Sequence, residues 1–182
     1  MTTRRSALVT LLAIAPALHA QVAAPAEIAA ELPGARLLGR GRLSFFGLHV
    51  YDARLWAGAG FEAERYAQHP LGLELEYART LDGSKIAERS LDEMKRSGPI
   101  PPALAQRWLE QMTRTFPDVV QGDRITGVQR PAQSARFFLN GALRGELQDA
   151  EFAARFFGIW LGPQTSEPAL RRALLGLDTG RS

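Results

Sequence analysis

The chain has 182 residues, 46% of them hydrophobic, which favours a single domain with a packed core. It carries 22 basic and 19 acidic residues, and two of the basic residues lie in the first twenty positions, so the remainder is close to neutral. No basic stripe indicates nucleic-acid binding, and no nucleic-acid partner is expected. The absence of cysteine excludes disulfides, thiol nucleophiles and zinc–thiolate sites.

Residues 1–20 are typical of a secretory signal peptide, because Arg4 and Arg5 precede an apolar stretch too short to span a bilayer comfortably. A twin-arginine signal and a first structural helix are the alternatives. Cleavage is expected after Ala20 or after Ala24. No later segment is apolar enough to cross a membrane, so we expect an exported, periplasmic protein without a transmembrane segment. Residues 21–33 are a predicted lead-in, and residues 34–178 are the predicted domain.

Residues 34–57 predict a long strand pair. Their ends alternate between apolar and polar side chains, whereas residues 45–51 are apolar at both odd and even positions. This pattern predicts a central hairpin that is covered on both faces at its middle and solvated at its ends. Gly47 indicates a bend, a bulge or a close approach by another group. A ligand cleft could lie against such a hairpin.

The following segments predict one short helix, further strands and four longer helices. Residues 62–69 form a helical turn or two, and residues 71–79 alternate strictly, as a strand with one solvated face that includes Glu74 and Glu76. A helix over residues 84–96 takes its cap from Asp82-Gly83-Ser84, and a second helix follows over residues 101–116. Strands 124–130, 135–139 and 142–147 come next, the last two joined by Asn140-Gly141.

Asp149 is expected to cap an aromatic helix that Gly162-Pro163 ends, and Thr165 or Ser166 caps the last helix, which stops at Gly176. The element order therefore predicts an α+β fold with an antiparallel sheet and helices gathered on one face.

Few residues outside this framework indicate chemistry. Gly39-Arg-Gly41 leads into a strand rather than a helix, so it does not predict dinucleotide binding. His49 and His69 have no partner at metal-ligand spacing, and neither a metal nor a cofactor is expected. Lys85 and Arg89 lie one turn apart on the first long helix. They form either a solvated face paired with nearby acids, or two cations that face a cleft and hold an anionic or phenolate-like ligand.

Five segments together resemble the chalcone-isomerase-like family, specifically its exported bacterial branch. They are GLHVYDARLWA (47–57), SKIAERSLDEM (84–94), FPDVVQGDRITGV (116–128), FFLNGALRGEL (137–147) and FFGIWLGPQTSEPALRRALLG (156–176). The resemblance implies an open-faced sandwich, in which a large antiparallel sheet is packed by a layer of helices. This agrees with the element order predicted from the chain.

In plant chalcone isomerases of this family, a guanidinium, a threonine, a tyrosine, a lysine and an asparagine organise the catalytic cleft. Carried over to this chain, the resemblance keeps the lysine as Lys85 and puts Phe46 at the threonine, Asp82 at the tyrosine and Arg89 at the asparagine. Arg36 lies near the guanidinium position. Phe46 cannot donate the polarising hydrogen bond, and losing one aimed donor typically lowers a rate by about 10²–10³.

Other members of this fold bind fatty acids, holding the carboxylate with an arginine and a tyrosine. The resemblance makes Arg36, Tyr51, Lys85 and Arg89 candidates for that role, with Phe46 as an apolar wall. A further set of aromatic residues forms either more of the wall or ordinary core packing: Phe45, Phe156, Phe157 and Trp160.

Three functions follow as hypotheses. The first is an exported protein that binds a small apolar ligand with an acidic or phenolic group, such as a fatty acid, in a cleft between sheet and helices. The second is a cofactor-free isomerase acting on an unsaturated ketone or acid, with Lys85 and Arg89 as catalytic residues that stabilise an enolate. The third is an accessory protein with a protein partner, which predicts a filled interior and an exposed apolar patch.

Overall fold

A computed structural model describes residues 22–177, so the predicted signal peptide and residue 178 lie outside the described residues. Within that range, six strands form one antiparallel sheet in sequential order. The strands are β1 (Arg36–Phe45), β2 (Leu48–Ala57), β3 (Leu71–Tyr77), β4 (Arg124–Arg130), β5 (Ser134–Leu139) and β6 (Ala142–Leu147). The α-helices are α1 (Ala26–Glu31), α2 (Gly83–Met94), α3 (Pro102–Thr115), α4 (Ala150–Leu161) and α5 (Pro168–Leu174). Two short 3₁₀ helices are η1 (Ala63–Gln68) and η2 (Lys95–Ser97).

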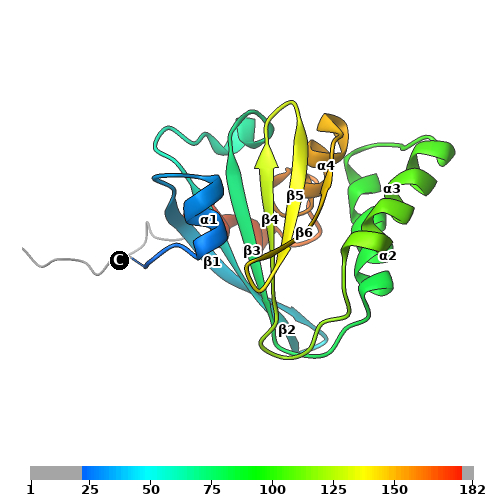
Figure 1. The fold of residues 1–182 in the computed structure, drawn as a ribbon, viewed down its shortest axis with the longest axis horizontal. Coiled ribbons are helices and arrows are strands. Elements are labelled where there is room, and N and C mark those ends of the chain that lie inside the picture. Colours follow the sequence, from blue (N-terminus) through cyan, green and yellow to red (C-terminus); the bar gives the residue numbers. More distant parts are fainter. Residues whose placement is uncertain (1–21, 178–182) are drawn as a thin grey trace, which may run out of the picture.

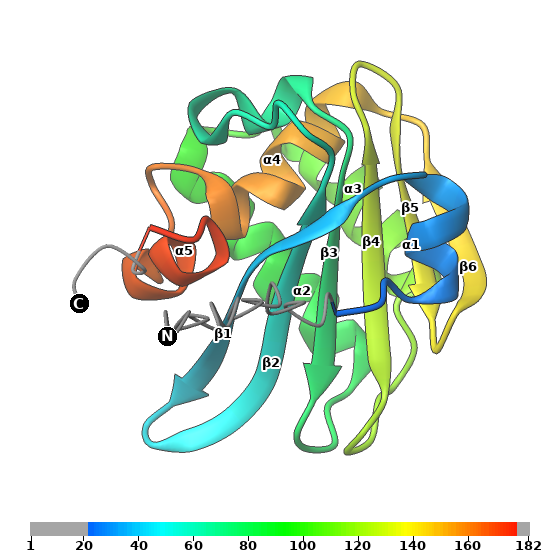
Figure 2. The same ribbon diagram turned by 90° about the vertical axis from the view of Figure 1, so that its left-hand side faces the viewer.

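The helices α2, α3 and α4 cover one face of the sheet, and α1 lies against the other face (Figures 1 and 2). The predicted α+β class and open-faced sandwich are confirmed. No helix among residues 22–177 is long and apolar enough to cross a bilayer. The main core lies between the sheet and the helix layer, and it is rich in aromatic rings that include Phe137, Phe152, Phe156 and Phe157.

The β1–β2 hairpin differs from its prediction. It lies at an edge of the sheet rather than at its centre, and Phe46-Gly47 forms its turn, with φ of 47° and 76°. Phe45, Phe46 and Leu48 are exposed. The apolar residues at both parities therefore come from a tight turn, which interrupts the alternation, and not from a strand covered on both faces.

The β5–β6 turn confirms the prediction made from Asn140-Gly141. Both residues have positive φ, 49° and 88°, as a two-residue hairpin turn requires. The amide of Arg124 also donates to Asn140 Oδ1 at 2.8 Å, which ties this turn to the neighbouring strand β4.

Two helix starts show how the caps differ from simple sequence rules. Asp149 caps α4 as predicted, accepting from the amide of Phe152 at 3.0 Å and also from Trp108 Nε1 at 2.9 Å. Burial alone would raise the pKa of Asp149, but these hydrogen bonds outweigh it and the pKa lies below its usual range. Asp82 of the predicted Asp82-Gly83-Ser84 segment is the N-cap residue of α2, but its side chain accepts no capping hydrogen bond. The amide of Gly83 donates instead to Asp118 Oδ1 at 2.8 Å.

The Gly39-Arg-Gly41 pattern has a packing role. A Cβ on Gly39 would lie 2.2 Å from the carbonyl oxygen of Ala173, and one on Gly41 would lie 2.5 Å from Leu170 Cδ1. Real Cβ atoms do not approach other atoms so closely, so the absence of side chains here lets α5 pack directly on β1.

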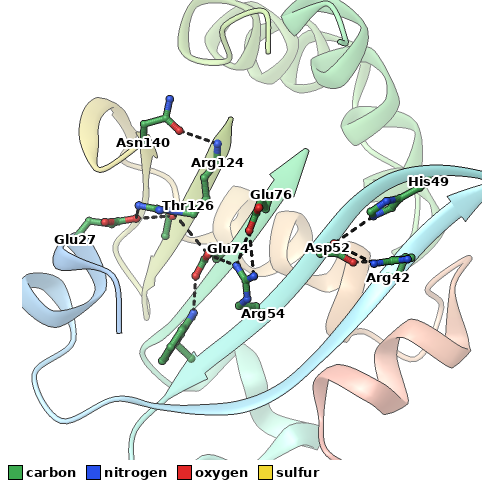
Figure 3. A network of polar contacts seen from close by, with 11 residues as sticks. Glu27, Arg42, His49, Asp52, Arg54, Glu74, Glu76, Arg124, Thr126 and Asn140 are labelled. Atoms are coloured by element: carbon green, nitrogen blue, oxygen red, sulfur yellow. Dashed lines mark hydrogen bonds and ion pairs between the residues drawn. The ribbon is translucent and has the colours of Figure 1, made fainter. Parts of the chain in front are cut away.

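The outer face of the sheet carries a network of ion pairs, which α1 partly covers (Figure 3). Glu74 is only 3% exposed and accepts from Arg54 Nη1 at 2.6 Å and from Trp56 Nε1 at 3.0 Å. The expectation that Glu74 is solvated is therefore wrong. Glu27 of α1 accepts from Arg124 Nη2 and from Thr126 Oγ1, each at 2.8 Å, so the predicted lead-in contains a helix bonded to the sheet.

Candidate ligand-binding site

A cavity of about 380 Å³ lies between the sheet and the helix layer, within the size range of small-molecule sites. Strands β1 to β4 form its sheet side, and α2 and α4 form its helix side. Most of its lining is apolar: Leu43, Phe45, Val50, Leu75, Leu81, Ile86, Phe116, Ile125, Phe156 and Ile159.

The periodicity of the strands and of α2 explains which side chains reach the cavity. Alternate strand residues point to the same face, so Tyr51 on β2 and Leu75 and Tyr77 on β3 all face the helices. On α2, Ile86 and Ser90 are four residues apart, so they lie on the same face of the helix and both line the cavity. The cavity is therefore mainly apolar on both its sheet side and its helix side.

Two buried tyrosines supply hydroxyl groups to this interior. Trp160 Nε1 donates a hydrogen bond to the hydroxyl of Tyr51 at 2.9 Å. The rings of Tyr51 and Tyr77 meet edge to face, with centroids 5.9 Å apart. Burial raises the pKa of both tyrosines well above the usual range, so both hydroxyls are neutral at neutral pH. Tyr51 accepts from Trp160, and its own O–H donates to no residue between 22 and 177, so it is available to a ligand oxygen.

Lys85 and Arg89 have features of both predicted arrangements, a solvated face paired with acids and two cations that face a cleft. Both line the cavity, yet both are largely exposed, with side chains 68% and 66% accessible. Lys85 Nζ binds Glu88 Oε2 at 2.8 Å, and this carboxylate raises the pKa of Lys85. Arg89 Nη2 lies 2.6 Å from Glu93 Oε1. The two cations therefore lie at the rim of the cavity, each with an acid partner on its own helix.

Glu93 places a carboxylate beside the two cations at this rim. Its side chain lines the cavity and is only 9% exposed, and it contacts Arg96 Nε at 3.6 Å as well as Arg89. Glu167, from the segment before α5, also lines the cavity. The carboxylate of Glu93 offsets the charge of Arg89, so an anionic ligand that approaches Arg89 also meets a buried negative charge.

A comparison with known protein families shows the family to which this chain belongs. The family model described as chalcone isomerase-like matches residues 19–176. The chain belongs to the chalcone isomerase-like family. The resemblance found from the five sequence segments is thus confirmed at the level of the family.

Two relatives extend this result. The chalcone isomerase-like chain is 29% identical over 139 residues to an uncharacterized protein of Haemophilus influenzae, covering 76% of this chain and 67% of that protein. The fold of the present chain is similar to that in the crystal structure of a fatty-acid binding protein of Arabidopsis thaliana. The TM-score is 0.61 and the sequence identity is 15%, over 79% of this chain and 87% of the Arabidopsis chain.

The structure brings together three of the five predicted ligand-binding residues of this chalcone isomerase-like protein. Tyr51, Lys85 and Arg89 line the cavity, but Arg36 and Phe46 do not. Arg36 opens β1 and pairs with Ala57, at the end of the hairpin away from the turn. The ten residues of β1 span about 33 Å, and those that line the cavity, Leu43 and Phe45, lie at the opposite end of the strand from Arg36. Phe46 is in the turn and 90% exposed, so the cleft wall expected at this position is absent.

Sequence reasoning missed several lining residues, chiefly Tyr77, Arg79, Glu93 and Glu167 as cavity groups. The alternation of β3 places Tyr77 on the covered face and could have indicated it. Of the expected aromatic walls, Phe45, Phe156 and Trp160 line the cavity, whereas Phe157 is core. His49 pairs with Asp52 at 3.4 Å (Figure 3). No group of three or more potential metal ligands occurs among residues 22–177.

Proposed function

We propose that this protein binds a small, mainly apolar ligand with one acidic or phenolic oxygen, such as a fatty acid, in the cavity between the sheet and the helices. The observation that carries the proposal is an apolar cavity of about 380 Å³ in which the Tyr51 hydroxyl is held by Trp160 with its own proton free. Apolar walls with a few placed polar groups are the usual composition of a ligand site.

The binding mode follows from the distribution of polar groups. The ligand's apolar part lies against Ile86, Ile159 and their neighbours, which removes its surface from water at about 25 cal/mol per Å². Its oxygen accepts from Tyr51, and a charged head group also reaches Arg89 at the rim. The similar fold of the Arabidopsis fatty-acid binding protein supports a ligand of this class.

The experiment is a search for bound ligand, followed by titration. Mass spectrometry of the natively purified protein should detect a small amphipathic molecule, which decreases in Lys85→Ala. In titrations with dodecanoate, Ile159→Trp, which narrows the cavity, should weaken binding strongly, and Tyr51→Phe should weaken it by about 3- to 10-fold. Arg36→Ala, outside the cavity, is the matched control and should bind normally. Normal binding by Ile159→Trp would refute the site.

A cofactor-free isomerase is the second candidate, because neutral hydroxyls of Tyr51 and Tyr77 inside the cavity could donate to an enolate oxygen, with Lys85 and Arg89 at the rim. Incubation with an unsaturated ketone such as a chalcone, followed by absorbance, tests it. Turnover that Tyr51→Phe and Lys85→Ala both slow would establish catalysis, and no turnover above background would exclude this activity for that substrate.

A periplasmic location belongs to the same proposal, and the charge and apolar pattern of residues 1–20 support it. Cell fractionation of the full chain and of a chain without residues 1–20 tests it. The full chain should appear in the periplasmic fraction in shortened form, and retention of both chains in the cytosol would contradict export.

A further inference from the structure

Two turns of the sheet have nearly the same backbone but different residues. Asn140 and Gly141 have φ of 49° and 88°, and Phe46 and Gly47 have φ of 47° and 76°. Asparagine before glycine is the preferred pair for this geometry, whereas a bulky residue with positive φ is disfavoured. The β1–β2 turn thus carries phenylalanine where the backbone favours asparagine.

Core packing does not compensate for this unfavourable conformation. Phe46 is 90% exposed, and its ring contact is with the neighbouring Phe45, at 4.5 Å between centroids. Phe45, Phe46 and Leu48, here called the apolar tip, are all exposed, and residues 43–48 include no charged side chain. Figure 2 shows this turn at the lower left corner of the sheet. Exposed aromatic surface on a strained turn indicates a role outside the fold.

The apolar tip is continuous with the cavity and adjoins a cation. Phe45 belongs to the tip and also lines the cavity, as does Arg79. The amide of Ala78 donates to the carbonyl of Val50 at 2.9 Å, which places Arg79 next to the base of the hairpin. Arg79 is exposed and makes no ion pair with any residue between 22 and 177. Its guanidinium is therefore available to a phosphate.

We propose that the apolar tip docks on the surface of a bilayer that contains anionic phospholipid. Phe46 and Leu48 enter the interfacial region, and Arg79 binds a lipid phosphate. A stable protein interface buries about 800 Å² on each partner, more than three side chains on a protruding turn supply, whereas a lipid surface requires no complementary shape. Where the proposed function holds, docking also brings the cavity next to the lipid, so that an apolar ligand enters without crossing water.

Vesicle sedimentation tests the docking without any cavity ligand. The probe is the chain without residues 1–20, which retains every described element, mixed with vesicles of phosphatidylethanolamine and phosphatidylglycerol or with phosphatidylcholine alone. Phe46→Asn creates the preferred Asn-Gly turn, so it should keep or raise the unfolding temperature while weakening partition into the anionic vesicles by about 10- to 100-fold. Leu143→Asn changes another exposed apolar residue, 51% exposed on β6 at the far edge of the sheet, and should partition normally.

Each outcome bears directly on the proposal. Arg79→Gln should reduce binding to the anionic vesicles more than it reduces the weak binding to phosphatidylcholine, whose phosphate is balanced by a choline cation. Equal partition by wild type and Phe46→Asn, or none by wild type at any lipid concentration, overturns the docking. Equal wild-type binding to both vesicle types overturns the anionic assignment. Self-association that Phe46→Asn abolishes, without lipid binding, assigns the tip to a second copy instead. Dodecanoate binding by Phe46→Asn should be normal, which separates this proposal from the proposed function.

Discussion

Replacing Glu93 by glutamine should make the cavity bind anionic ligands more tightly. Glu93 Oε1 lies 2.6 Å from Arg89 Nη2, so a ligand carboxylate that shares this guanidinium comes within about 5 Å of the Glu93 oxygen. Two unit charges at about 5 Å repel by about 3 kcal/mol at an effective dielectric of about 20, and by about 1 kcal/mol in water. Glu93→Gln removes this repulsion and keeps the shape of the side chain. Dodecanoate should therefore bind about 5- to 150-fold more tightly.

The assay is isothermal titration with dodecanoate and with dodecanol, which differ in the charge of the head group. Only dodecanoate should gain affinity, because the alcohol carries no charge for Glu93 to repel. Asp92→Asn removes a negative charge from the same helix, where Asp92 pairs with Lys95 outside the cavity lining, and should change neither affinity by more than about 2-fold. Equal gains for both ligands, or no gain for dodecanoate, would refute the conclusion that Glu93 opposes an anion at Arg89.

Three further predictions concern stability. Glu74→Gln should lower the free energy of unfolding in urea by about 2–4 kcal/mol, because the buried carboxylate binds two donors, while the more exposed Glu76→Gln should lower it by under about 1 kcal/mol. Because the pKa of Asp149 is lower in the folded protein than in the unfolded chain, where it is about 4, ionised Asp149 stabilises the fold above about pH 4 and this contribution is lost as the pH falls through the folded pKa. When unfolding is measured at successive pH values, the free energy of unfolding of Asp149→Asn should therefore fall less steeply with acid than that of the wild type. Gly39→Ala should lower the free energy of unfolding by at least about 1–3 kcal/mol and make α5 the first site of limited proteolysis, because the new Cβ at position 39 would clash with backbone carbonyls of α5. Resistance to proteolysis equal to that of the wild type would contradict the close packing.

The sequence was sufficient for those parts of the fold that local rules determine. The alternation of β3 and the Asn140-Gly141 pair are both local signals, and the strand and the turn that they predict are confirmed, although the face of β3 that carries Glu74 is buried rather than solvated. The run at residues 45–51 misled because a two-residue turn made of Phe46-Gly47 contains no conventional turn residue except the glycine. A pattern of apolar residues cannot distinguish a covered strand from an exposed apolar turn.

The cavity was less predictable because its polar groups come from distant parts of the chain. Trp160 and the Tyr51 hydroxyl are 109 positions apart, and helical periodicity indicates only that Trp160 faces inward. Lys85 and Arg89 were identified as two cations one helical turn apart, and the structure places both at the rim of the cavity. The position of Glu93 within the same cavity depends on the packing of α2 against the sheet, which no local pattern gives.

The attachment of α1 sets a limit on how far the chain can be trimmed from its N-terminus. Glu27 and Glu31 connect this short helix to Arg124, Arg130 and Arg136 of the sheet. A cut after Ala20 or after Ala24 leaves both carboxylates in place, whereas a cut only a few residues later removes Glu27. Arg124 and Thr126, which donate to Glu27, would then lose an acceptor, so trimming the chain past Glu27 should destabilise the sheet.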